Sequence, residues 1–292
     1  MGFKIYIDGK WYNKEDAKVS VFDHGLLYGD GVFEGIRSYN CLVFKLDEHI
    51  ERLYESAHTI MLKIPLTKEE LKAAVIESLK KNQLKDAYIR LIVTRGEGDL
   101  GLDPRKCKKA GVIIIADKIN LYTKDFFENG LKVVTVPTAR NLPEALNPSI
   151  KSLNYLNNIM AKIEAINAGV EEAIMLNNYG YVAECSGDNI FMIKKGILKT
   201  PPVYHGSLRG ITRDVIIWIA SNQGIEVQRT TLTRHDLFNA DECFLTGTAA
   251  EIIPVVEVDG RTIGSGKVGE ITKKLTWGFR ESTKTEGVKY AL

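Results

Sequence analysis

The feature that most constrains the fold is a single change of pattern near the middle of the chain. Strand-like and helix-like segments follow one another along most of the 292 residues, but the apolar strand pattern lapses between Asp117 and Lys132. A chain of this length has enough residues for two domains, each with its own core. We therefore expect an α+β protein with a small first domain over residues 1–118, a connecting loop over 119–131 and a larger second domain over 132–292.

The first half predicts two hairpins followed by two helices. Asp8-Gly9 separates two β-rich runs, as in a tight hairpin. Asp47 is expected to cap the first helix, and Thr67 with Glu70 forms a capping box for the second. Strands are expected over residues 33–38, 42–46, 87–94 and 112–116.

The second half predicts a longer series of elements. Strands are expected over residues 132–136, 173–177, 181–184, 189–194 and 242–246, with a hairpin over 255–263. Helices are expected over residues 155–168 and 212–222, and from about 267 onward. In the first of these helices Leu156, Ile159, Ile163 and Ile166 recur at spacings of three and four, which is typical of an amphipathic helix.

Composition excludes several classes of partner. The chain is 45% hydrophobic and 26% charged, with a formal net charge of +2, so nothing favours binding to nucleic acid or to an anionic membrane. No apolar run approaches the roughly 20 residues that span a bilayer, and the start of the chain lacks a secretory signal, so a cytoplasmic protein is the simplest expectation. The cysteines form no C-x-x-C motif, which predicts free thiols and no metal site. They are Cys41, Cys107, Cys185 and Cys243.

Lys151 differs from the other lysines in its surroundings. It lies in N-P-S-I-K-S-L-N-Y-L, without a carboxylate nearby in sequence, whereas most lysines here lie in solvated runs such as K-E-E-L-K. A partly desolvated lysine can act as a neutral amine, which is the state that attacks the carbonyl carbon of an aldehyde. Lys151 is therefore the candidate nucleophile.

Several segments, in this order, resemble the signatures of the class IV (fold-type IV) pyridoxal-phosphate aminotransferases. The likeness extends over nearly the whole chain and is strongest to the branched-chain amino acid aminotransferases. It implies the two-domain fold of the D-amino acid aminotransferase-like enzymes. The segments are Y-G-D-G-V-F-E-G-I-R (28–37), H-I-E-R-L (49–53), Y-I-R (88–90), K-S-L-N-Y (151–155), the tract from E-C-S-G-D-N-I-F to L-R-G-I-T-R (184–213), and T-G-T-A-A-E-I (246–252).

The resemblance implies a role for each residue around pyridoxal 5′-phosphate. Lys151 would bind the cofactor and move the substrate proton, and Glu184 would hold the proton on the ring nitrogen. Arg52 would provide a positive charge for the phosphate, and Tyr155 would place its hydroxyl against the phenolic oxygen. Cys185 stands after the acid, where relatives often have glycine. A helix start and a small-residue turn would also bind the phosphate, through Gly210, Ile211, Thr212 and Thr248.

Structural alternatives exist for three of these residues. The spacing alone allows Arg52 to form a surface ion pair with Glu48 or Glu55. An isolated Glu184 would more often be a solvated residue on an edge strand, and Tyr155 a core aromatic residue.

Aminotransfer needs a pocket that accepts an apolar amino acid and glutamate in turn. Arg90, beside Tyr88, would pair with the distal carboxylate of glutamate. The α-carboxylate would rest on Tyr88 and the amides of Thr248 and Ala249. By analogy with the family, Tyr28 and Leu102 would come from the neighbouring subunit, so a homodimer or a dimer-based hexamer is expected. The walls of the pocket are predicted to be Tyr28, Phe33, Leu102 and Tyr122, and Gly35 is also expected to bind the substrate.

The resemblance implies transamination of leucine, isoleucine and valine with 2-oxoglutarate by a ping-pong mechanism. The partners are then small amino acids and 2-oxo acids. The alternatives are a D-amino acid aminotransferase, an aminodeoxychorismate lyase and, more remotely, a silent cofactor-binding scaffold. Relatives that process D-amino acids carry an arginine and a histidine in the pocket, but no histidine follows Arg95 within thirty residues here. His24 is expected to be structural.

Overall fold

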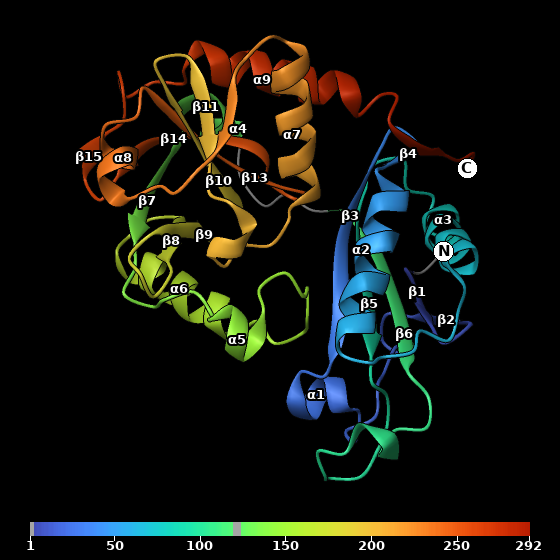
Figure 1. Cartoon of the computed structure of the whole chain (residues 1–292). Helices are drawn as coiled ribbons and strands as arrows, with labels where there is room; N and C mark the ends of the chain where they lie inside the picture. The colour runs from blue at the N-terminus through green and yellow to red at the C-terminus, as the bar shows by residue number, and fades with distance from the viewer. Residues whose placement is uncertain (1–2, 119–123) are drawn as a thin grey trace. The chain divides into compact units, whose positions relative to one another are not determined.

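The computed structural model describes residues 3–118 and 124–292, which form two compact units (Figure 1). Of the described residues, the first unit comprises 3–118, 150–154 and 283–292, and the second comprises 124–149 and 155–282. From the sequence, residues 150–154 and 283–292 are expected in the second domain. Strand pairing places them with the first unit instead, because Ser152 forms a bridge to Val32 and the last strand pairs with an early one. The expected α+β class is confirmed by both units, which each combine helices with a sheet.

The first unit is built on a seven-stranded sheet with the order β16-β4-β3-β5-β6-β1-β2, in which all neighbours are antiparallel. The predicted hairpin at Asp8-Gly9 is confirmed, and both residues have positive φ, as a two-residue hairpin turn requires. The β3–β4 hairpin is also confirmed, and its turn lies at Asn40-Cys41. The strands are β1 (Lys4–Ile7), β2 (Lys10–Asn13), β3 (Gly31–Tyr39), β4 (Leu42–Phe44), β5 (Ala87–Thr94), β6 (Gly111–Asp117) and β16 (Gly287–Lys289).

The helices of the first unit are α1 (His24–Tyr28), α2 (Leu46–Thr59) and α3 (Lys68–Lys81), with a 3-10 turn over Pro104–Lys106. The capping box of Thr67 and Glu70 at the start of α3 is confirmed. The predicted cap at Asp47 is wrong. The chain leaves β4 through Lys45 in a left-handed conformation, so α2 has already begun before Asp47, whose carboxylate pairs with Lys72.

The second unit contains a nine-stranded sheet with the order β12-β11-β10-β13-β14-β7-β8-β9, with β15 paired to β14. Helix α4 occupies part of the segment that the sequence assigned to the connecting loop, and α9 begins at Glu270 rather than near Lys267. The strands are β7 (Leu131–Thr135), β8 (Glu172–Leu176), β9 (Val182–Cys185), β10 (Asn189–Lys194), β11 (Ile197–Thr200), β12 (Val227–Arg229), β13 (Glu242–Gly247), β14 (Glu251–Val258) and β15 (Arg261–Thr262). The helices are α4 (Lys124–Asn129), α5 (Pro143–Leu146), α6 (Leu156–Asn167), α7 (Ile211–Asn222), α8 (Arg234–Phe238) and α9 (Glu270–Ser282), with a 3-10 turn over Val203–His205.

Helix α6 packs against β8 with its small residues rather than its large ones. Ala161 and Ala165 are fully buried, whereas the predicted apolar stripe is exposed, with Leu156 at 64% and Ile163 at 43%. Small side chains let the helix backbone approach the sheet closely, so the larger residues remain on the outer face. The helix itself was predicted correctly.

No helix in the described part of the chain is long and apolar enough to cross a membrane.

Candidate active site

Lys151 is fixed by its backbone to both a helix and a strand of the first unit. Its N–H donates to Ser56 Oγ on α2 at 3.2 Å, and its carbonyl accepts from the N–H of Phe33 on β3 at 3.0 Å. The Nζ atom lies 4.6 Å from the centroid of the Phe33 ring. The two backbone bonds and this contact place the amine against the face of the Phe33 ring.

Four predicted substrate residues lie together on one face of the β3–β5 pair. Gly35 stands directly opposite Arg90, and residues opposite each other in an antiparallel pair share a face. Arg90 Nη2 donates to Tyr88 Oη at 3.1 Å, and its guanidinium carbon lies 4.7 Å from the centroid of Phe33. A Cβ atom at Gly35 would lie 2.1 Å from Tyr88 Oη, so the hydroxyl can occupy this position only above a glycine. The Lys151 amine and the Arg90 guanidinium thus both lie against the ring of Phe33.

The opposite face of β3 carries a carboxylate that the sequence analysis did not select. Glu34 is fully buried and accepts from Arg52 through two bonds of 2.7 Å, from Nε to Oε1 and from Nη2 to Oε2. His49 Nδ1 lies 2.8 Å from Oε2. Burial opposes ionisation of Glu34, but Arg52 and His49 outweigh it and lower the pKa of the carboxyl to about 2. The suggested surface ion pair of Arg52 is therefore wrong, because its partner is this buried carboxylate.

Tyr28 and Leu102 form a separate group with the loop that follows β5. The Tyr28 hydroxyl donates to the carbonyl of Leu100 at 2.5 Å, and Leu102 is 79% exposed. The ring Nε2 of His24 lies 2.8 Å from the carbonyl of Asp99, and the side chain is buried. His24 thus holds the same loop, as expected of a structural histidine. Tyr122, the remaining predicted wall, lies outside the described residues.

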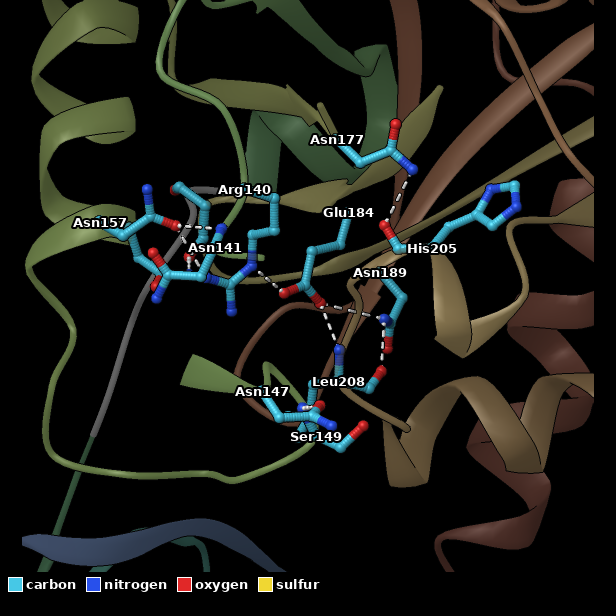
Figure 2. A network of polar contacts seen from close by, with 12 residues as sticks. Arg140, Asn141, Asn147, Ser149, Asn157, Asn177, Glu184, Asn189, His205 and Leu208 are labelled. Atoms are coloured by element: carbon cyan, nitrogen blue, oxygen red, sulfur yellow. Dashed lines mark hydrogen bonds and ion pairs between the residues drawn. The ribbon is translucent and has the colours of Figure 1, made fainter. Parts of the chain in front are cut away.

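Glu184 lies at the centre of a polar network in the second unit (Figure 2). It lies on β9 and is 5% exposed, so the alternative of a solvated edge residue is wrong. Its Oε1 accepts from Arg140 Nε at 2.7 Å, and its Oε2 accepts from the N–H of Leu208 at 2.9 Å. Asn189 Nδ2 lies 3.5 Å from Oε2 and donates to the carbonyl of Leu208 at 3.0 Å. The carboxylate is therefore fixed in orientation as well as buried.

The sequence analysis missed Arg140, which follows β7. Its Nη1 donates to Asn157 Oδ1 at 2.8 Å (Figure 2). Its backbone N–H donates to the carbonyl of Leu176 at 2.8 Å. It lies in P-T-A-R-N-L-P, where nothing in the local pattern distinguishes it from a surface arginine. Its partner on β9 is far away in sequence, so only the folded chain reveals the pair.

The start of α7 offers backbone amides to an anion. Gly210 occupies the N-cap position and has no side chain that could bind the free N–H groups of the first turn. A Cβ atom there would lie 2.0 Å from Asn189 Oδ1, so a larger residue would displace the network around Glu184. The amides of Ile211 and Thr212 lie in this first turn, where the helix dipole favours negative charge.

A second glycine-dependent turn connects β13 to β14. A Cβ atom at Gly247 would lie 2.0 Å from Asp188 Oδ1, which makes this position, like Gly210, one for glycine. Thr248 and Ala249 form the turn that follows. Tyr155 is half-buried at the N-cap of α6. The second unit thus holds a fixed carboxylate, an uncapped helix start and a small-residue turn, which match the donor set that a phosphorylated pyridine aldehyde needs.

Known proteins resemble this chain in sequence and in fold. Residues 31–258 match the family model described as amino-transferase class IV. A Methanocaldococcus jannaschii protein, named provisionally as a branched-chain-amino-acid aminotransferase, is 57% identical over 98% of both chains. The structure of Escherichia coli branched-chain amino acid aminotransferase is 38% identical, with a TM-score of 0.94 over 96% of this chain and 94% of that one. The Thermobaculum terrenum branched-chain amino acid aminotransferase, in its PLP-form, is 30% identical, with a TM-score of 0.88 over 97% and 94%.

The family match covers β3, the Lys151 segment, the Glu184 network and the start of α7, which are the parts that carry the candidate groups. The identity to the relatives extends beyond these parts to nearly the whole of each chain. The chain therefore belongs to the class IV aminotransferase family.

Proposed function

We propose that this protein is a branched-chain-amino-acid aminotransferase that uses pyridoxal 5′-phosphate. It transfers the amino group of L-leucine, L-isoleucine or L-valine to 2-oxoglutarate by a ping-pong mechanism and forms L-glutamate. The observation that carries the proposal is the group on one face of the first sheet, where Lys151 and Arg90 both lie against the Phe33 ring. It combines an amine, an apolar wall and a cation for a second carboxylate. The relatives that bear this activity in their names support the same assignment, and the PLP-form of one of them supports the cofactor.

Each candidate residue then has one task toward the cofactor, which supplies an electron sink when it is bound. Lys151 would hold the cofactor through its amine and would move the proton of the substrate α-carbon. Glu184, whose carboxylate is fixed by Arg140 and Leu208, would hold the proton on the ring nitrogen. The Tyr155 hydroxyl would face the phenolic oxygen. For the phosphate, the first unit offers the positive charge of Arg52, and the second unit offers the first-turn amides at Gly210, Ile211 and Thr212 together with Thr248.

The two substrates differ mainly in the end of the side chain. Leucine, isoleucine and valine place apolar atoms against Phe33, whereas glutamate places its distal carboxylate against Arg90. For the α-carboxylate that both substrates share, the first unit offers Tyr88 and the second unit offers the amides of Thr248 and Ala249. Tyr28 and Leu102, which lie on the chain as a separate exposed group, serve the pocket of a second subunit, so the active protein is a homodimer or a dimer-based hexamer.

The test is to follow the two half-reactions separately through the visible absorbance of the bound cofactor. L-leucine and L-glutamate should each bleach the band, and 2-oxoglutarate should restore it. Bleaching by D-alanine alone would instead favour a D-amino acid aminotransferase. Replacing Lys151 by alanine should abolish both half-reactions, and retained turnover in that variant would exclude the mechanism.

Arg90→Gln separates the two substrates. Loss of a charge-assisted bond should slow the glutamate half-reaction by about 10- to 100-fold, while leucine, which makes no such bond, should be affected only slightly. Equal losses for both substrates would assign Arg90 to the shared α-carboxylate instead.

A further inference from the structure

Glu34 occupies a position on β3 where a hydrophobic residue would be expected. Side chains alternate along a strand, and Val32 and Ile36, which share its face, are both fully buried in the core of the first unit. Glu34 is also fully buried, beneath helix α2, which packs on β3. The proposed chemistry uses Phe33 and Gly35 on the other face but gives Glu34 no task. A buried carboxylate is costly unless charged partners compensate it.

Its partners come from one face of helix α2. His49, Arg52 and Ser56 are three and four residues apart, which places them on the same side of the helix. His49 and Arg52 bind the Glu34 carboxylate, and Ser56 accepts the N–H of Lys151. The residue before Glu34, Phe33, donates its N–H to the carbonyl of Lys151 and lies beneath its amine. One helix face and one strand therefore fix both the candidate amine and the candidate phosphate-binding arginine.

The bond between Arg52 and Glu34 fixes a plane as well as a distance. Two parallel N–H groups of the guanidinium meet the two carboxylate oxygens, each at 2.7 Å, and this fork prevents rotation about the last bonds of the arginine. A flexible arginine loses side-chain freedom when it binds an anion, whereas one that is already held loses little. Glu34 thus reduces the entropic cost of binding an anion to Arg52.

We propose that Glu34 is a positioning residue for the phosphate group of the cofactor, which it serves by holding the guanidinium of Arg52 in the orientation that binds phosphate. The inference rests on the proposed function and adds to it a residue that does not touch the cofactor. The charge of Glu34 acts in the opposite direction, because a carboxylate near a phosphate weakens its binding. The sign of the effect therefore distinguishes positioning from simple electrostatics.

The decisive variant is Glu34→Gln. Three donor groups converge on the two carboxylate oxygens, but an amide has only one acceptor oxygen, so at least one donor must face an NH₂ group and the fork is lost. The full chain, freed of cofactor, is titrated with pyridoxal 5′-phosphate and with pyridoxal, which differ only in the phosphate. We expect the preference for the phosphorylated form to fall about tenfold in Glu34→Gln. An unchanged or increased preference would overturn the proposal, since removal of charge alone predicts an increase.

Glu55→Gln is the matched control. It removes the same charge three residues after Arg52 on α2, but Glu55 is exposed. Its preference for the phosphorylated form should stay within about a factor of two of the wild type, because an exposed charge is strongly screened. If Glu55→Gln lowered the preference for the phosphorylated form as much as Glu34→Gln does, the loss could not be assigned to the fork between Arg52 and Glu34. This outcome would also contradict the proposal.

A double-mutant cycle tests whether Glu34 acts through Arg52. Arg52→Lys keeps the positive charge but cannot form the two-bond fork. If Glu34 works by holding Arg52, adding Glu34→Gln to Arg52→Lys should lower the preference little further. Equal losses in both backgrounds would contradict the proposal. A general structural defect is recognised because it weakens pyridoxal as much as the phosphorylated form.

Two outcomes keep the inference separate from the proposed function. If wild-type protein binds neither pyridoxal form through Lys151, the proposed function fails. If the wild type binds both and Glu34→Gln leaves their ratio unchanged, only the inference fails. Should Glu34→Gln not fold, Glu34→Asp takes its place. It keeps the charge but shortens the side chain, so positioning predicts a fall in the ratio and electrostatics alone predicts no change.

Discussion

The two units each contain a buried glutamate–arginine pair, and the pairs are built differently. Both have a 2.7 Å bond from arginine Nε to Oε1 of the carboxylate. Arg52 donates one hydrogen bond to each carboxylate oxygen of Glu34, and His49 is a third donor. Glu184 receives only one bond from Arg140, and a backbone amide binds its other oxygen. The first arrangement fixes the guanidinium, and the second fixes the carboxylate.

A buried ion pair therefore does not itself reveal which of its two residues binds the ligand. In the first pair the proposed ligand group is the cation, Arg52, and the anion holds it. In the second pair it is the anion, Glu184, and the cation holds it. The holding residue in each pair has a further partner of its own, since Glu34 binds His49 and Arg140 binds Asn157. The predictions below test whether these roles are opposite, as the bonding suggests.

The largest effect is expected for Glu184→Gln. A neutral amide lacks the negative charge that raises the pKa of the ring nitrogen, so the electron sink weakens. Turnover with L-leucine and 2-oxoglutarate should fall on the order of 10²–10³-fold. Steady-state kinetics and the absorbance spectrum of the bound cofactor measure this loss.

The control is Glu171→Gln in the same unit, where the side chain is exposed and turnover should remain near that of the wild type. If Glu184→Gln also retained the turnover of the wild type, the carboxylate would have no part in the mechanism. The two pairs would then not have opposite roles.

A smaller effect is expected for Arg140→Lys, because Arg140 acts through Glu184. Lysine keeps the positive charge but lacks the planar guanidinium whose Nε and Nη1 bind Glu184 and Asn157 separately, so turnover should fall about tenfold. In the double variant with Glu184→Gln the two losses should not multiply, since the residue that Arg140 holds has already lost its function. Multiplying losses would indicate that Arg140 acts on the reaction independently.

Sequence patterns predicted the local features of the fold well and the long-range features poorly. The capping box of Thr67 and Glu70 depends on neighbouring residues, so it could be predicted without the rest of the chain. The outward face of α6 could not, because the contact with β8 is made by Ala161 and Ala165, which carry little hydrophobic signal. The placement of residues 150–154 with the first unit likewise depends on a pairing with β3 that lies far away in sequence.

The candidate site shows the same division. The resemblance selected Lys151, Arg52 and Glu184, but it offered no sign of Arg140. Glu34 did leave a signal, because it interrupts an alternation in which Val32 and Ile36 point to the core. A charged residue at a core-facing strand position indicates a partner or a function, but the sequence alone does not reveal that the partners of Glu34 are His49 and Arg52.

The smallest predicted effect is on the stability of the protein in acid. It arises from His49, which belongs to the Glu34–Arg52 pair and has no counterpart among the described contacts of the Glu184–Arg140 pair. Burial lowers the pKa of His49, although Glu34 raises it, and the charges of Arg52 and Lys151 lower it further. The unfolded chain therefore binds this proton at a higher pH than the folded chain does. The free energy of unfolding should fall as the pH decreases below the ordinary value of about 6.5. Glu34 adds a second loss at lower pH, between about 4.5 and its folded pKa of about 2.

His49→Asn isolates the first of these two steps, because asparagine can still donate to Glu34 but does not titrate. Denaturant unfolding at a series of pH values should give a flatter slope for His49→Asn than for the wild type between about pH 6.5 and 5. The difference cannot exceed one proton, which is about 1.4 kcal/mol per pH unit. Equal slopes would mean that the imidazole takes up its proton without cost, and Glu34 would then be paired with two cations rather than with one cation and a neutral donor.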